Sequence, residues 1–306
     1  MNNLEQKLFE KLTDLHKIPS GAFSLRKNGE SETRTSTKEI EIIPKKDKSG
    51  IDVVIKPNVI NKSVHIPVII TVGGLSDLVY NDFYVGENSD VVIVAGCGIH
   101  NKTCKDSMHN GIHSFHLEKN SKVRYIERHI GEGNGTGGKI LNPVTKIFLK
   151  ENAQMFMETT QLGGVTSTLR TTTAKLADNA KLNIQENLLT TDNQTAKTKF
   201  KVQLIGKNSG VDVVSHSVAK DNSYQEFKSN VIGKAECFGH VECDGILLDN
   251  ARISSLPMID AQNKNASLVH EAVIGKIAGD ELIKLMTLGL SQKEAEDLII
   301  EGFLLG

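Results

Sequence analysis

The chain has 306 residues, with 36 lysine and arginine residues against 37 aspartate and glutamate residues and a hydrophobic fraction of 39%. This composition is typical of a folded protein of one or two domains. A net charge of −1 provides no basic excess, so we expect neither a nucleic-acid nor a membrane-surface partner. No apolar run approaches the roughly 18 residues of a membrane span, and no signal-peptide core opens the chain, so we expect a cytoplasmic location.

The first 50 residues predict one helix and a connector. Residues 4–16 carry apolar side chains at a period near 3.6, which indicates an amphipathic helix. Residues 17–50 are rich in charge, and the alternation at 39–43 predicts one early strand. The four cysteines are too few for a disulfide scaffold, so we expect them to be reduced and able to bind metal.

From residue 51 the chain becomes a series of short β-branched runs separated by a repeated phrase. The phrase is a charged residue, Asn, usually Ser or Ala, a variable residue and an apolar residue. Its asparagines are Asn88, Asn120, Asn152, Asn179, Asn208, Asn250 and Asn265. Asn tolerates the left-handed conformation, the small residue fits a tight corner, and the apolar residue begins the next strand.

A turn repeated roughly every 30 residues without intervening helices is typical of a coil that stacks on itself. We therefore predict an all-β chain with a parallel β-helix over 51–269. A β-sandwich with coincidental turns is the alternative. Residues 270–306 form a separate segment, in which residues 280–286 and the capping box Ser291 to Glu294 predict a helix pair over 280–305.

Three residues near the end of the β region form a possible metal site. Cys243 is followed by Asp244 and Gly245, a turn expected to end the strand and expose the thiol where His270 and Glu271 arrive. A thiolate, an imidazole and a carboxylate are ligands for a transition metal or an iron–sulfur cluster.

A second group of metal-ligand residues lies between residues 96 and 116. Its better candidates are Cys97, His100, Cys104, His109 and His113. Imidazole and thiolate together suit zinc or iron, but the spacing is not that of a zinc finger. Metal binding by this cluster is therefore left open.

The glycine run 131–139 resembles a phosphate loop only superficially. Lys139 is followed by Ile140 and not by Ser or Thr, and no strand-to-helix junction is predicted there. We expect a flexible loop leaving the β-helix.

The C-terminal sequence resembles the SufB/SufD scaffold proteins of iron–sulfur cluster assembly. The resemblance rests on residues 269–277 (VHEAVIGKI), 288–291 (LGLS) and the pattern from Ala295 to Phe303, and with the β-helix it covers about residues 51–306. It implies a right-handed β-helix, a dimer of such subunits and a SufC-like ABC ATPase docked on the C-terminal helices.

The resemblance also implies roles for individual residues. Cys243 matches the scaffold cysteine of the B-type subunit, and His270 with Glu271 matches its acidic-histidine motif. Position 269 is Val where B-type subunits usually carry an acidic residue, and most of the long N-terminal region of the larger bacterial subunits is missing. The chain thus resembles the short B-like subunits of archaea and anaerobes, for which a homodimer is favoured over a pair with a paralogous subunit.

The resulting hypothesis is a non-catalytic scaffold that holds a transient iron–sulfur cluster, or another metal, and passes it to apo iron–sulfur proteins. ATP hydrolysis is assigned to the partner, and the expected docking residues are Leu282, Leu285, Leu298, Ile299 and Phe303. Two alternatives are a zinc-binding structural protein and a polysaccharide-acting β-helix enzyme. The enzyme is disfavoured because sugar subsites use stacking aromatics, and the chain has no Trp and four Tyr.

Overall fold

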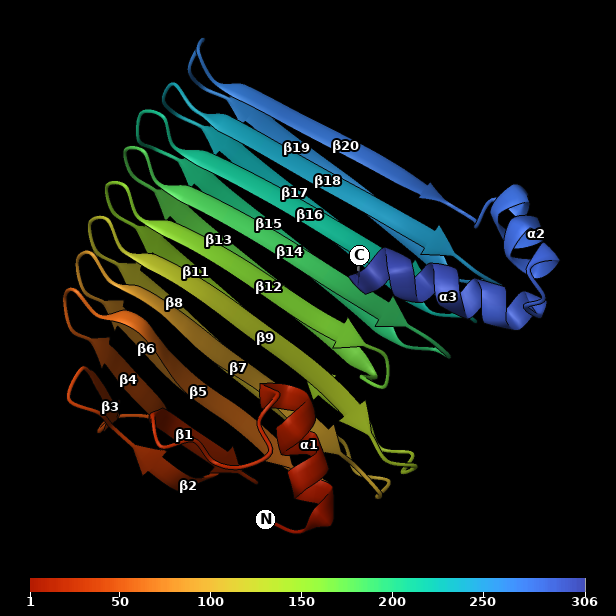
Figure 1. Ribbon diagram of the computed structural model, residues 1–306, viewed down its shortest axis with the longest axis horizontal. Helices are drawn as coiled ribbons and strands as arrows, with labels where there is room; N and C mark the ends of the chain where they lie inside the picture. The colour runs from red at the N-terminus through yellow and green to blue at the C-terminus, as the bar shows by residue number, and fades with distance from the viewer. Residues whose placement is uncertain (306) are drawn as a thin grey trace.

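The structure is a computed structural model that describes residues 1–305, and most of it is a parallel β-helix (Figure 1). Each coil contributes one strand to each of two facing sheets, which we call sheet A and sheet B. A short helix lies at the N-terminus and a helix pair at the C-terminus. The fold expected from the sequence is therefore confirmed.

Strands that neighbour one another in space are separated by a full coil in the sequence. In spatial order, sheet A contains β2 (Glu30–Thr35), β1 (Ala22–Lys27), β5 (Ile60–Ile70), β7 (Asp90–His100), β9 (Lys122–Glu132), β12 (Gln154–Leu162), β14 (Lys181–Thr190), β16 (Gly210–Ala219), β18 (Phe238–Leu247) and β20 (Ser267–Gly275). Sheet B contains β3 (Ile40–Pro44), β4 (Gly50–Ile55), β6 (Ser76–Val85), β8 (Ser107–Leu117), β10 (Lys139–Leu141), β13 (Ser167–Leu176), β15 (Thr195–Leu204), β17 (Tyr224–Gly233) and β19 (Arg252–Ala261), and β11 (Val144–Leu149) also lies between β8 and β13.

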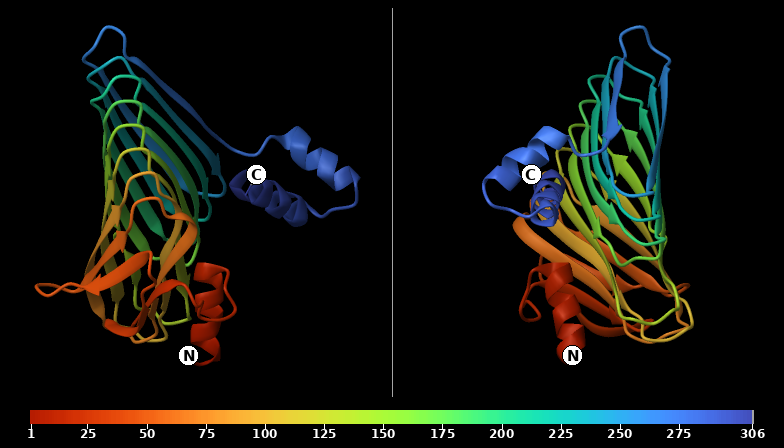
Figure 2. Two further views of the ribbon diagram at one scale, coloured as in Figure 1. Left: turned by 60° about the vertical axis from the view of Figure 1, so that its left-hand side comes forward. Right: turned by 90° about the vertical axis from the view of Figure 1, so that its right-hand side faces the viewer.

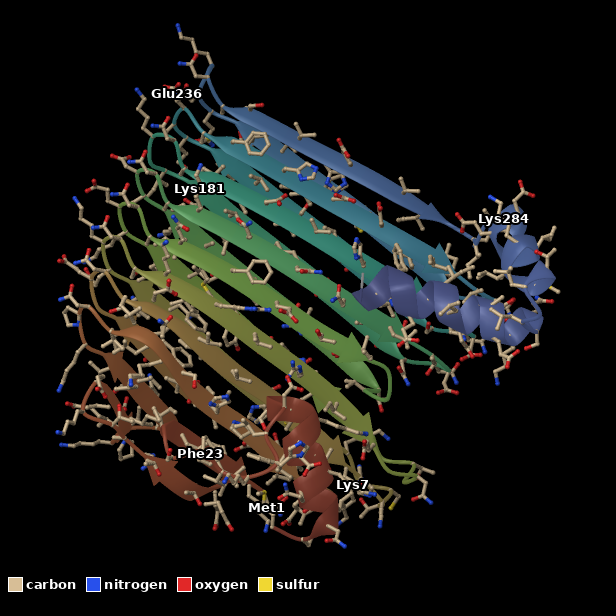
Figure 3. The ribbon with its side chains drawn as sticks, in the orientation of Figure 1. Met1, Lys7, Phe23, Lys181, Glu236 and Lys284 are labelled. Carbon is tan, nitrogen blue, oxygen red and sulfur yellow. The ribbon has the colours of Figure 1, made fainter. Side chains whose placement is uncertain are left out.

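The repeated Asn phrase forms the corner that leads from sheet B to sheet A, near Lys181 and Glu236 in Figure 3. Asn88, Asn120 and Asn152 all have φ between 56° and 59°. The amide of Asn120 donates to Asn88 at 2.9 Å, and that of Asn152 donates to Asn120 at 2.9 Å. These three coils thus repeat both the backbone conformation and the side-chain hydrogen bond of the coil before.

Asn250 does not belong to this ladder, because it lies at the opposite corner, between β18 and β19. There Asp249, and not Asn250, takes the left-handed conformation, with φ 55°. Asp192, Asp221 and Asp249 build a second ladder, in which the carboxylate of one coil accepts from the backbone N–H of the coil before it at 2.7 and 3.1 Å. The irregular spacing of the last phrases results from combining two corners in one series.

The glycine run is a packed part of the coil and not a loop that leaves it. Gly135 N donates to Asn101 O at 3.0 Å, and Gly137 N donates to Thr103 O at 2.9 Å. A Cβ added to Gly137 would lie 2.2 Å from Lys105 O, so the two backbones approach too closely for a side chain. The expected loop is present between β9 and β10, but it does not leave the coil, because its glycines allow close backbone contact with residues 101–105.

The N-terminal end has antiparallel strands at its two edges and a helix on the outer face of sheet A (Figure 1). Helix α1 (Asn3–Thr13) lies over β5, β7 and β9, where its Leu8, Phe9 and Leu12 are fully buried with Phe23. Strand β2 pairs antiparallel with β1, and β3 pairs antiparallel with β4. The connector expected over 17–50 therefore holds β1 and β2 in addition to one early strand. The division of the chain at residues 50 and 269 stays a prediction.

After β20 the chain leaves the β-helix as α2 (Gly279–Thr287) and returns to the outer face of sheet A as α3 (Gln292–Leu305), as Figure 2 shows. Helix α3 packs on β14 and β16, with Ile300 and Leu304 buried against Val218. Ser291 and Glu294 form the predicted capping box, in which Ser291 N donates to Glu294 at 2.8 Å and Glu294 N donates to Ser291 at 3.3 Å. Within residues 1–305, no helix has the length and apolar character needed to cross a membrane.

Candidate functional site

Cys243 lies inside the β-helix, in the middle of β18. Its exposed fraction is 0%, and the strand continues through Asp244 and Gly245 to Leu247. Our expectation that these two residues end the strand and expose the thiol was wrong, because Asp244 pairs with both His216 and Val273 in unbroken parallel ladders. The thiol points into the interior, where alternation places every second residue of β18.

Polar side chains surround Cys243 on the inner face. Ser215 is its register partner on β16, and Ser255 lies on β19 of the opposite sheet. Burial raises the pKa of the Cys243 thiol to about 11, although the Ser255 hydroxyl opposes that shift. The thiol is therefore protonated at neutral pH, and a bound metal would have to displace its proton.

His270 and Glu271 leave β20 on opposite faces. His270 pairs with Val241 and shares the inner face with Cys243, whose own partner on β20 is Ala272. Both ring nitrogens of His270 are buried without a hydrogen-bond partner, and burial lowers its pKa. Glu271 pairs with Glu242 on the exposed outer face. The structure therefore groups Cys243 with His270 and separates both from Glu271.

Behind Cys243 the interior contains a fully buried ionic network. Ser215 donates to Glu186 at 3.2 Å, and Thr198 donates to the same carboxylate at 2.8 Å. Arg170 bonds Glu127 and lies 3.4 Å from Glu186, so one guanidinium serves two carboxylates. Burial raises the pKa of Glu186. At Glu127 burial also raises the pKa, but the opposing interactions, with that of Arg170 the largest, together outweigh it and lower the pKa to about 2.

The network continues toward the N-terminal coils. Tyr125 donates to Glu127 at 3.0 Å and lies 2.7 Å from Nδ1 of His113, while Nδ1 of His129 lies 3.1 Å from Arg170. Burial lowers the pKa of His113 to about 4 and that of His129 to about 3. Both imidazoles are therefore neutral at physiological pH.

The candidates of the 97–116 cluster fall into two groups. Cys97, His109 and His113 face one interior cavity of about 20 Å³, which holds about one water molecule. His100 lies by Glu132, with a 3.9 Å separation, and Cys104 is exposed in the loop between β7 and β8. The structure thus brings three of the five candidates together.

The side chains of His109 and His113 are already hydrogen-bonded within the protein, and the thiol of Cys97 is buried. His109 Nδ1 bonds Asp77 at 3.0 Å, and both ring nitrogens of His113 have polar partners. Burial raises the pKa of Cys97 far above its ordinary value. Within residues 1–305, no three His, Cys, Asp or Glu side chains are arranged to hold a metal ion. Gly111 keeps the cavity open, since a Cβ there would lie 3.1 Å from His113 Nε2 and 3.4 Å from His109 Nε2.

A larger hollow of about 730 Å³ lies on the outer face of sheet A, over β9, β12 and β14. Its cations are already paired, since Arg124 lies 3.1 Å from Glu158 and Lys11 bonds Glu132. Arg128 lies 2.6 Å from Asp14. The hollow is therefore close to charge balance without a ligand.

The last coil leaves two strand edges uncovered. Strand β19 pairs only with β17, and β20 only with β18, so no strand within residues 1–305 covers their outer edges. Large apolar side chains are exposed there: Met258 is 60% exposed, Ile259 46% and Val273 71%. Open edges with exposed apolar side chains are typical of a surface that pairs with another chain.

The helix pair uses part of the expected docking set for internal packing. Leu282, Ile299 and Phe303 pack against the cluster that fixes α3 to sheet A, Leu285 is half-buried, and Leu298 is 50% exposed. Three further apolar residues are exposed and free to contact a partner: Ile283 is 59% exposed, Met286 43% and Leu288 80%. They lie on or just after α2, which Lys284 marks in Figure 3.

The sequence analysis missed Glu127, Arg170 and Glu186. A signal was present, because Val123, Tyr125, Glu127 and His129 alternate on one face of β9 and so place a carboxylate and an imidazole among core residues. A buried charge that appears on an apolar face calls for a buried partner.

Comparison with known proteins agrees with this architecture. Residues 80–303 match the family described as "SUF system FeS cluster assembly, SufBD core domain". Proteins named "Iron-sulfur cluster assembly SufBD family protein" include one from Archaeoglobus fulgidus, 28% identical over 74% of this chain and 60% of its own length. One from Pyrococcus horikoshii is 29% identical over 76% of this chain and 69% of its own length. One from Methanocaldococcus jannaschii is 27% identical over 79% of this chain and 76% of its own length.

The match therefore spans only about 60% of the Archaeoglobus relative. The family match, over residues 80–303, includes the β-helix from within β6 onward and most of the C-terminal helix pair. The chain belongs to the SufBD family of iron–sulfur cluster assembly proteins.

Proposed function

We propose that this protein is a scaffold on which an iron–sulfur cluster is assembled, with Cys243 as the thiol that receives iron and sulfide. The observation that carries the proposal is the position of Cys243, between the buried ionic network and the open last coil. Family membership supports the role in cluster assembly. Iron and sulfide are cargo in this proposal, and the protein itself is not an enzyme.

His270 is a further ligand candidate on the same face. Its unpaired ring nitrogens lie on the same inner face as Cys243, and a neutral imidazole can bind a metal without first losing a proton. Glu271 lies on the outer face and could act only at the rim or after rearrangement of β20. The Cys97, His109 and His113 group remains a secondary metal candidate.

Anaerobic reconstitution with iron and sulfide tests the role of Cys243. The wild-type protein should retain both elements and become coloured, and Cys243→Ser should lose most of each. Cys237→Ser is the matched control, because Cys237 is also buried but precedes β18. Equal loss in both variants would instead indicate a shared two-cysteine site. Bound zinc without sulfide would favour a zinc-binding structural protein.

We also propose that the exposed side of α2 docks an ABC-type ATPase. An apolar stripe on a short helix with no buried residue of its own suits a helix-in-groove contact. Removing residues 278–306 should abolish co-purification with the ATPase, and Ile283→Lys with Met286→Lys should do so without disturbing α3. Retained binding in both variants would place the interface elsewhere.

The proposed scaffold pairs with a second copy of this chain, or with a paralogous subunit, through the edges of β19 and β20. Pairing would bring two Cys243 thiols toward one interface and remove exposed apolar side chains from water. Apo iron–sulfur proteins would accept the finished cluster. The proposal keeps the protein in the cytoplasm, where its four free thiols remain reduced.

A further inference from the structure

The outer face of sheet B carries a dense group of lysines, which we call the lysine face. Its members are Lys146 on β11, Lys175 on β13, Lys197, Lys199 and Lys201 on β15, and Lys228 on β17. Five of the six are exposed, and Lys228 is half-buried. They all point outward because the residues that alternate with them fill the core.

Acidic residues scarcely offset this charge. On the outer faces of β11, β13, β15 and β17 the single carboxylate is Glu226, which bonds Lys228 at 3.1 Å. Among residues 1–305, the other five lysines of the face form no ion pair. A chain with 36 basic and 37 acidic residues thus concentrates positive charge on one side of one sheet.

An aromatic ladder borders the lysine face. Tyr84 stacks on His116, and His116 stacks on Phe148, each with ring centroids 5.1 Å apart. Phe148 is also the register partner of Lys175. Tyr84 is 43% exposed and Phe148 37%, so the ladder adds apolar surface beside the charges.

The geometry favours a protein partner over a nucleic acid. Inner rings of the ladder cover one another, so they offer few free faces for stacking bases. The outward cations of the four strands are all lysines, which act as point charges, whereas bidentate phosphate recognition favours arginine. Lysines two residues apart on a strand are spaced by about 6.6 Å along the backbone, close to the roughly 5–6 Å between the Cβ atoms of residues i and i+4 of a helix.

We propose that the lysine face binds an acidic protein surface, with the carboxylates of an exposed helix lying along β15 and an apolar edge on the aromatic ladder. Charge complementarity supports the proposal, since an excess of cations over carboxylates on one sheet face attracts and orients a surface of opposite charge. This surface lies on the sheet opposite the one that carries Cys243, α2 and α3. The proposal therefore goes beyond the scaffold function and can fail or hold independently of it.

Fluorescence anisotropy with a labelled helical peptide of about 20 residues, carrying glutamates on one face, tests the proposal. The variant Lys197→Glu/Lys199→Glu/Lys201→Glu should weaken binding by at least about tenfold, and wild-type binding should weaken with added salt. The control Lys122→Glu/Lys181→Glu/Lys207→Glu makes the same charge change at exposed positions around sheet A and should alter affinity by less than about twofold.

Equal weakening in both triple variants would overturn the proposal, because net charge alone would then explain it. Tighter binding of a single-stranded oligonucleotide of equal charge, or of vesicles containing anionic lipid, would also overturn it. Circular dichroism checks the fold of each variant. If charge reversal disturbs the fold, the Lys197→Gln/Lys199→Gln/Lys201→Gln variant tests the proposal instead. This variant should lose less affinity for the peptide than the Glu variant. An unchanged affinity would contradict the proposal.

Discussion

Both ends of the β-helix have strands with one unpaired edge, and the two ends differ in how these edge strands are built. The N-terminal edges are short and protected: β2 has 6 residues and is mostly charged or hydroxylated, and β3 has 5 residues and ends at Pro44. The C-terminal edges, β19 and β20, have 10 and 9 residues and expose large apolar side chains. Short polar edges prevent strand pairing, whereas long apolar edges invite it.

The buried polar groups do not separate the two ends as clearly. Around Arg170, in the closed interior between the ends, the buried charges are satisfied by one another, and both imidazoles are neutral. Two buried ring nitrogens without a hydrogen-bond partner occur at His270 in the last coil, and likewise at His100 on β7, nearer the N-terminal end. The ends therefore differ in their strand edges, and the Arg170 network supports the coils between them.

The largest effect on stability is expected in the closed interior. Arg170→Met leaves Glu127 and Glu186 buried without their shared cation, which should cost about 3–5 kcal/mol of unfolding free energy. Arg124→Met removes the exposed pair with Glu158 and should cost at most about 1 kcal/mol. Urea denaturation of both variants checks the contrast, and similar losses would contradict the assignment.

A smaller difference in unfolding free energy is expected between alanine variants at the two ends of the β-helix. Leu12→Ala removes a fully buried side chain from the helix that covers the N-terminal coils, and should cost about 2–5 kcal/mol. Met258→Ala, at a side chain that is 60% exposed, should change the unfolding free energy of the single chain by less than about 0.5 kcal/mol. Thermal or urea unfolding at low protein concentration measures both. A large loss from Met258→Ala would mean that the open end already packs within one chain.

Acid should destabilise the closed interior through its histidines. His113 and His129 have folded pKa values near 4 and 3, below the ordinary 6.5, so the unfolded chain binds more protons as pH falls below 6.5. Stability should therefore decrease from pH 6.5 toward pH 4, by on the order of 1 kcal/mol per histidine at pH 5.5. Protonation of Glu127 further lowers the stability of the folded chain below pH 4.5, because its folded pKa is depressed. Glu186 has a raised pKa in the folded chain, so its protonation partly offsets this loss of stability.

The change in urea midpoint between pH 7.5 and pH 5.5 measures this effect. His113→Asn should reduce the change, and His16→Asn is the control because that side chain is 92% exposed. An unchanged pH dependence in His113→Asn would contradict the account.

The sequence was sufficient for the fold because the Asn corner repeats in residue type as well as in conformation. Asn58 joins the ladder, with φ 62°, but its neighbours Pro57 and Val59 do not fit the phrase, so it was not identified. Strand β2 was missed because its sequence, ESETRT, is polar on both faces and lacks the alternation that marks a half-buried strand.

The site was less predictable because its contacts join different coils. Cys243 could be chosen from the resemblance, but the turn expected after it depended on Asp244 and Gly245, which the neighbouring strands hold in β18. Arg170 meets Glu127 from the opposite sheet, 43 residues along the chain. Alternation identifies the face on which a residue lies, but not its partner across the interior.

The most direct test of the account is the mass of the protein in solution, measured by light scattering at micromolar concentration. The wild type should have twice the mass of one chain, and the Met258→Lys/Val273→Lys variant should have a single-chain mass. Leu78→Lys, an exposed apolar residue on β6 near the closed end, should leave the mass unchanged. A wild-type protein of single-chain mass, or a double variant that keeps the doubled mass, would contradict the claim that the open end pairs with a second subunit.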